Sequence, residues 1–187
     1  MSAPDTRHAI MTTARAMVQA RGYNALSFRE IAKAVGVKSA SIHYHFPTKG
    51  DLGAALARAY TDEAIAAMDA LAASGASPAD CVAGFAAIYR AALEANNRMC
   101  LCGIMAAEHE DLPPEVRVEV KRFTDAAIAW LTRLQQTRAD LSPEAAHERA
   151  LGIYAAIGGA QLMARGRGDI SVFDAAIAAY RAAGLVP

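Results

Sequence analysis

The sequence lacks any run of about eighteen consecutive apolar residues, the length that a helix needs to cross a bilayer, so we expect no membrane-spanning segment. Its first ten residues, MSAPDTRHAI, lack the basic and then apolar pattern of a signal peptide. Cysteine is scarce, and an odd number of three cysteines does not form a disulfide framework. Together these absences predict a protein of the reducing cytoplasm.

Runs of valine, threonine and aromatic residues are also lacking, and aromatic residues make up only 6% of the chain. Alanine dominates instead, which favours helix over strand. The 187 residues are 54% hydrophobic and 20% charged, a composition that can bury a core and is typical of a soluble protein. We therefore predict an all-α fold of about nine helices, without repeats or a low-complexity linker.

The net charge of zero hides an asymmetry. Residues 1–50 contain seven lysines and arginines and two acidic residues, a net charge of +5, which leaves −5 for residues 51–187. A basic N-terminal module on an acidic body suits a protein with one end that faces DNA, although a charged face can also serve solvation alone.

The chain is organised around residues 22–52, with the sequence GYNALSFREIAKAVGVKSASIHYHFPTKGDL. Ser27 and Glu30 form a predicted capping box, and apolar residues follow at helical spacing. Gly36 stands where a helix end needs a positive φ, and a second helix fits Ser39–His45 before Pro47. This is the layout of a helix-turn-helix, whose second helix lies in the DNA major groove.

The same stretch resembles the DNA-binding region of TetR-family transcriptional regulators, without gaps from about Ile10 to Leu52. The matching residues are Gly22, Ser27, Ile31-Ala32, Val35-Gly36-Val37 and the run from Ser41 to Lys49. The resemblance implies DNA binding by residues 1–47 and an all-helical ligand-binding and dimerisation domain in residues 48–187. It also implies a homodimeric repressor, not an enzyme, that a small molecule releases from a palindromic operator. His43 stands at the family's usual tyrosine, and Leu26 where threonine is frequent.

Successive residues of a helix point about 100° apart, so the residues of Ser39–His45 cannot all face DNA. Ile42 and Phe46, spaced i, i+4, should pack inward, which leaves Ser39, Ala40, His43 and Tyr44 on the outer face. Ser39 or His43 could bond base edges, and Ala40 could touch a thymine methyl. Tyr44, Lys49 and the Ser27 hydroxyl, at helix starts and ends, suit phosphates instead. The predicted DNA-binding residues are Ser27, Lys38, Ser39, Ala40, Ser41, His43, Tyr44, His45 and Lys49.

Helix starts are predicted at three further capping sequences, Thr48–Asp51, Ser77–Asp80 and Ser171–Asp174, and at Ser142. The first opens a helix of about 25 residues, nearly 40 Å long, which joins the DNA-binding head to the body.

The last two helices carry many small residues, and small residues let helix backbones approach closely. They predict either tight packing within one subunit or a four-helix interface between two subunits, and the family resemblance implies the interface. The predicted dimer residues are Gly152, Ala156, Gly159, Ala160, Met163, Ala175 and Ala179.

Bulky and semi-polar residues of the middle helices are candidates for a mostly apolar effector pocket, although such residues are more often plain core. They are Phe85, Tyr89, Met105, His109, Phe123 and Trp130.

Cys100 and Cys102 are either small buried hydrophobic residues or redox-sensing thiols, which gives an alternative, thiol-based repressor. A zinc site would need about four ligands, and only Glu108 or His109 is near in sequence. Glu144 and His147 match half of a di-iron motif, but no second copy occurs. We therefore predict no metal, no cofactor and no catalytic site. A helical adaptor that uses the alanine-rich surfaces, with an incidental basic head, remains an alternative from another class.

Overall fold

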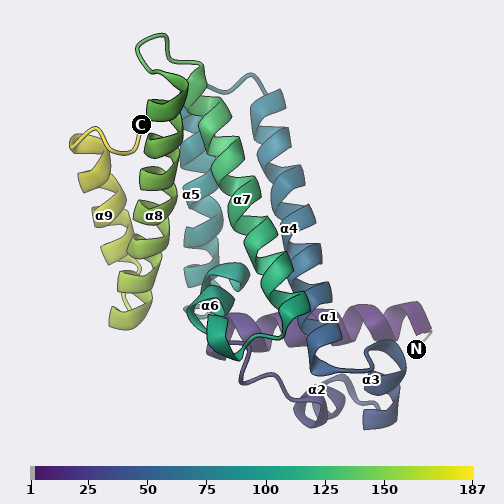
Figure 1. Ribbon diagram of the computed structural model, residues 1–187. Helices are drawn as coiled ribbons and strands as arrows, with labels where there is room; N and C mark the ends of the chain where they lie inside the picture. Colours follow the sequence, from purple (N-terminus) through teal and green to yellow (C-terminus); the bar gives the residue numbers. More distant parts are fainter. Residues whose placement is uncertain (1–2) are drawn as a thin grey trace. The chain divides into compact units, whose positions relative to one another are not determined.

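The computed structural model describes residues 3–187, and within that range it contains nine α-helices, one 3₁₀ turn and no strand (Figure 1). The predicted all-α class is confirmed. Met1 and Ser2, with which the predicted DNA-binding domain begins, lie outside the described residues. The elements are α1 (Ala3–Arg21), α2 (Phe28–Val35), α3 (Ser39–His45), α4 (Lys49–Ala73), α5 (Pro78–Glu94), α6 (Leu101–Ala107), η1 (His109–Asp111), α7 (Pro114–Gln136), α8 (Pro143–Arg167) and α9 (Ser171–Ala182).

The chain forms two compact units, neither of which is continuous in sequence. The first comprises residues 1–61 and 100–123, and the second comprises residues 62–99 and 124–187. Helices α4 and α7 each contribute one half to each unit. The predicted functional boundary at residue 47 therefore does not coincide with the edge of a compact unit, and it stays a prediction about function.

Side-chain caps begin α4 and α5 as the sequence predicts. At α4, the Thr48 N–H donates to Asp51 Oδ2 (2.9 Å) and the Asp51 N–H donates to Thr48 Oγ1 (3.0 Å), a reciprocal capping box. At α5, the Asp80 N–H donates to Ser77 Oγ (3.1 Å). Each bond satisfies an amide at the helix start that has no partner within the helix, and such caps stabilise a helix by about 1 kcal/mol.

Two capping predictions need correction. The Glu30 N–H bonds to Ser27 Oγ, but the Glu30 carboxylate accepts from Arg21 Nη2 (3.0 Å) instead of returning to the Ser27 amide. Ser171 is the first residue of α9 rather than its cap, and its N–H donates to Asp169 Oδ1. In both predicted boxes the carboxylate bonds an arginine instead of the helix start: Glu30 bonds Arg21, and Asp174 bonds Arg90 (2.7 Å).

In the first unit, α1 is the core helix for the helix-turn-helix. Its residues Ile10, Ala14 and Val18 are fully buried, as are Ile31 of α2 and Ile42 of α3. Helix α1 contacts α2, α3 and α6. A full apolar stripe on α1 thus fixes the short α2 and α3, which could not be stable alone.

In the second unit, an aromatic cluster lies at the centre. The Phe85 ring packs 5.3 Å from Tyr89 and 5.9 Å from Trp130, measured between ring centroids. The Trp130 Nε1–H donates to the Met68 carbonyl (3.1 Å), and Gln161 Nε2 donates to the Tyr89 carbonyl (2.8 Å). The buried polar atoms of this cluster therefore have partners, as a dry core requires. None of the described helices has the length and apolar character to cross a membrane.

Candidate nucleic-acid interface

The turn between α2 and α3 is built as a helix-turn-helix requires. Gly36 adopts φ +78°, and its N–H and that of Val37 both donate to the Ala32 carbonyl (2.9 Å each). This left-handed residue ends α2 and redirects the chain into α3 within three residues. Helices α2 and α3 contact each other and lie together at one end of the first unit (Figure 1).

Helix α3 has one buried face and one exposed face. Ile42 is fully buried and Phe46 is only 3% exposed. On the opposite face Ser39, Ala40 and His43 are exposed, and the Tyr44 side chain is 80% exposed. Ser41 and His45 are half-buried. The structure therefore brings four of the predicted DNA-binding residues together on one solvent-facing surface, which we call the α3 outer face (Ser39, Ala40, His43, Tyr44).

Two aromatic contacts order the histidines of α3. His43 Nδ1 lies 3.2 Å from the Pro47 carbonyl oxygen, and its ring meets the edge of Phe28 with centroids 4.9 Å apart. The Tyr44 ring packs edge-on against His45, 5.1 Å between centroids. These contacts fix the side chains of His43 and Tyr44, which both remain exposed on the α3 outer face.

Three of the predicted DNA-binding residues stand at helix starts. Ser27 caps α2 by accepting from the Glu30 N–H (3.4 Å), which leaves its own O–H able to donate elsewhere. Lys38 is the exposed cap residue of α3. Lys49 is engaged within the protein, because its Nζ lies 3.3 Å from the Asn24 carbonyl oxygen and 4.5 Å above the Tyr23 ring. Partial burial lowers the Lys49 pKa, and the negative charge of Glu108 partly offsets that effect.

The turn from α1 to α2 is anchored on residues far along the chain. Gly22 adopts φ +88°, and the Tyr23 N–H donates to the Glu108 carboxylate. Asn24 Nδ2 donates to Asp111 Oδ2 (2.7 Å). Burial, and secondarily the charge of Glu115, raises the pKa of Tyr23 to about 12. Sequence reasoning did not find these contacts, since an acidic stretch after an apolar helix gives no indication of its partner.

The six predicted effector residues are divided between the two compact units. Phe85, Tyr89 and Trp130 make the aromatic cluster of the second unit, whereas Met105 and Phe123 are buried in the first. His109 lies on η1 and is exposed. The effector pocket stays a prediction.

The cysteines do not have the environment of a redox sensor. The three cysteines, all among the described residues, form no disulfide and are buried, and both members of the predicted pair are 1% exposed. Burial raises the pKa of Cys102, an effect that Cys100 reinforces and a side-chain hydrogen bond with Thr61 opposes. Because the thiolate is the reactive species, a buried thiol of raised pKa is poorly reactive. This geometry argues for cysteines as small hydrophobic core residues.

The surface of α8 and α9 requires a further correction. Ala160 is fully buried and Ala156 is 8% exposed within the protomer, so neither is available to a partner subunit. Met163 is 47% exposed, Ala175 and Ala179 are exposed, and Gly152 and Gly159 are partly so. A surface groove of about 690 Å³ is lined by Leu162, Met163, Gly166, Arg167, Val172, Ala175 and Ala176. The exposed residues Leu151, Ala155 and Leu162 of α8 each precede a predicted residue by one position, which is about 100° around the helix.

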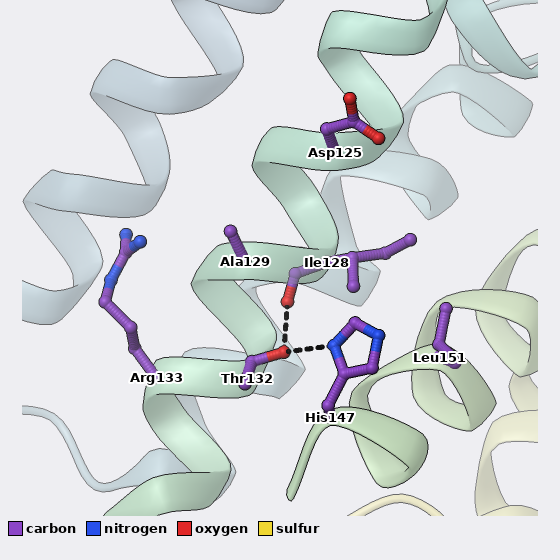
Figure 2. Close-up of a pocket in the computed structure, with 7 residues that line it drawn as sticks. All are labelled: Asp125, Ile128, Ala129, Thr132, Arg133, His147 and Leu151. Carbon is purple, nitrogen blue, oxygen red and sulfur yellow. Dashed lines mark hydrogen bonds between the residues drawn. The ribbon is translucent and has the colours of Figure 1, made fainter. Parts of the chain in front are cut away.

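A second open cleft lies between α7 and α8, with a volume of about 570 Å³ (Figure 2). There His147 Nδ1 lies 3.4 Å from Thr132 Oγ1, which itself donates to the Ile128 carbonyl (2.8 Å). Figure 2 shows Arg133 directed away from His147, so the charged groups do not converge on one point. Among the described residues no group of three or more histidine, cysteine or acidic side chains could hold a metal ion.

The fold and the α3 outer face define a helix-turn-helix DNA-binding protein. Comparison with curated proteins gave no match. The family model described as "Bacterial regulatory proteins, tetR family" matches residues 10–56. A TetR transcriptional regulator from Legionella pneumophila is 34% identical, with 90% of this chain and 91% of that chain covered and a TM-score of 0.85. A TetR-family regulator from Agrobacterium tumefaciens is 30% identical, with 93% and 94% covered and a TM-score of 0.86. The chain belongs to the TetR family, and it is a transcriptional regulator rather than an enzyme.

Proposed function

We propose that the protein is a homodimeric repressor that binds a palindromic operator and is released by a small-molecule effector. The observation that carries the proposal is the α3 outer face: four small or polar side chains, exposed on a helix whose opposite face is buried. The net charge of +5 in residues 1–50 favours approach to phosphates, and the charge of −5 in the rest keeps the body away from them. The free thiols fit a reducing cytoplasm.

The homodimer is supported by the apolar surface of α8 and α9. Leu162 is 62% exposed and Met163 is 47% exposed, and both line the groove between these neighbouring helices (Figure 1). Large exposed apolar side chains that gather in one place are typical of interaction sites. Two such surfaces related by a two-fold axis would pair as a four-helix interface.

Release requires that the effector prefer the state that does not bind DNA. Two recognition helices must reach major grooves about one helical turn apart, roughly 34 Å, so a displacement of a few ångströms prevents simultaneous binding. Helix α4 follows α3 directly and continues from the first compact unit into the second. A hundredfold preference of the effector for the released state supplies about 2.7 kcal/mol of coupling.

The proposal is tested by selecting bound DNA from a random pool and titrating the selected duplex with salt. We expect a palindromic site and an affinity that falls steeply with salt. Replacing Lys38 by glutamine should lower the slope of log affinity against log salt by about one per subunit, whereas Lys121→Gln on α7 should not change it. Absence of any DNA affinity would favour the adaptor.

The oligomeric state is tested by light scattering at micromolar concentration. The expected mass is twice the 19.7 kDa of the chain, and Met163→Glu should reduce it toward the monomer because a charge would enter the apolar interface. Ala139→Glu, at an exposed residue after α7, is the matched control. A monomeric wild type would refute the dimer.

A further inference from the structure

His43 has its two ring nitrogens in different situations. Nδ1 lies 3.2 Å from the Pro47 carbonyl oxygen, and a carbonyl oxygen can only accept a hydrogen bond. The proton of the neutral imidazole therefore resides on Nδ1. The edge contact with Phe28, 4.9 Å between centroids, holds the ring in this orientation.

The remaining nitrogen, Nε2, is consequently a hydrogen-bond acceptor in neutral His43. The side chain is exposed on the α3 outer face beside Tyr44, in the part of the helix-turn-helix that enters the major groove. The acceptor of the Nδ1 proton is the backbone carbonyl of Pro47, four residues further on. The position of this proton therefore does not depend on the ionisation of another side chain.

An acceptor and a donor find different partners on DNA. Phosphate oxygens are acceptors, so neutral Nε2 cannot bond to them. In the major groove the only donors are the amino groups of adenine N6 and cytosine N4, whereas guanine and thymine present acceptors. A tyrosine hydroxyl, the group that the family resemblance leads one to expect here, can donate to a phosphate.

From this geometry we infer that His43 is a base-reading residue, which selects adenine or cytosine at one position of each half-site through the exocyclic amino group. The inference rests on the proposed function, since it requires operator binding. It assigns base specificity at one position of the half-site to a single atom of the α3 outer face, Nε2 of His43. It also implies that His43 makes no hydrogen bond to a phosphate.

The test is a selection from randomised half-sites at pH 8. Wild type should enrich adenine or cytosine at one position, and His43→Ala should lose enrichment there alone, with an affinity loss of about three- to tenfold per half-site. His43→Lys, a pure donor, should shift that position toward guanine. His147→Ala, at an exposed histidine of the second unit, is the matched control and should keep the wild-type preference.

A base analogue separates the amino group from the rest of the base. In the selected site, the analogue that lacks the exocyclic amino group should weaken wild-type binding about three- to tenfold per half-site and leave His43→Ala binding unchanged. Circular dichroism of each variant should show the helical spectrum of the wild type, as the control for folding.

Two results would overturn the inference, and they differ in what they leave standing. A defined operator with guanine or thymine at the position that His43→Ala affects, or with no position affected, refutes base reading by Nε2 and preserves the proposed function. A wild type without any sequence preference refutes both.

Discussion

Replacing Gly22 by alanine tests whether the turn between α1 and α2 depends on its contact with Glu108. Gly22 has φ +88°, which costs an alanine about 1–2 kcal/mol. The added Cβ would lie 2.8 Å from Glu108 Cδ, so the carboxylate must leave and its hydrogen bond with the Tyr23 N–H is lost. A bond to a charged group contributes about 1.5–3 kcal/mol. We therefore expect Gly22→Ala to lower the free energy of unfolding by about 2.5–5 kcal/mol.

A double-mutant cycle separates these two contributions. Glu108→Ala alone removes the same hydrogen bond, so its cost should be contained within that of Gly22→Ala, and the double variant should be about 2 kcal/mol more stable than additivity predicts. Gly36→Ala is the matched control, because it too has a positive φ but its Cβ would meet no atom within 4 Å. It should cost only the backbone strain and show no coupling with Glu108.

The assay is urea unfolding at a fixed protomer concentration, since the stability of a dimer depends on concentration. Additivity of Gly22→Ala and Glu108→Ala within about 0.5 kcal/mol would refute the reasoning. So would equal coupling energies for Gly22 and Gly36, because only Gly22 lies against the carboxylate.

Three further outcomes are expected. Trp130→Phe should cost about 1–3 kcal/mol in urea unfolding, because it leaves the buried Met68 carbonyl without its donor; an unchanged midpoint would contradict this. The bidentate bond from Arg90 lowers the Asp174 pKa from 3.8, so its contribution is present above about pH 4 and is lost as the pH falls through the lowered value. Asp174→Asn should thus lower stability slightly at pH 7, and the difference should shrink as the pH falls below about 4, measured by thermal unfolding. Iodoacetamide should add no mass to the native protein and three adducts after denaturation; rapid native labelling of Cys102 would restore the thiol-sensor hypothesis.

The helix-turn-helix was predicted well because the residues that begin and end its helices act locally in the sequence. Gly36 and Pro47 bracket α3, and its observed range, Ser39–His45, is the predicted one. The inward turn of Ile42 and Phe46 follows from helical periodicity alone, and both are buried.

Contacts between residues distant in sequence could not be predicted in the same way. The Glu30 carboxylate bonds Arg21, nine residues before it, and Glu108 bonds Tyr23 across 85 residues. Neither partner is fixed by periodicity. Alanine patterns are also ambiguous, because a small residue suits a buried helix contact and an exposed interface equally. The pattern therefore does not indicate that Ala156 and Ala160 are buried within the protomer.

The make-up of the first compact unit bears on protein engineering. Chimeric regulators join the DNA-binding head of one protein to the sensor of another, and residue 47 looks from the sequence like the natural junction. In this chain the Tyr23 amide bonds Glu108 and the Asn24 side chain bonds Asp111. A cut at residue 47 would replace both of these partners with residues of the other protein. A graft of this head therefore has to carry residues 100–123 together with residues 1–61, as a two-segment transplant.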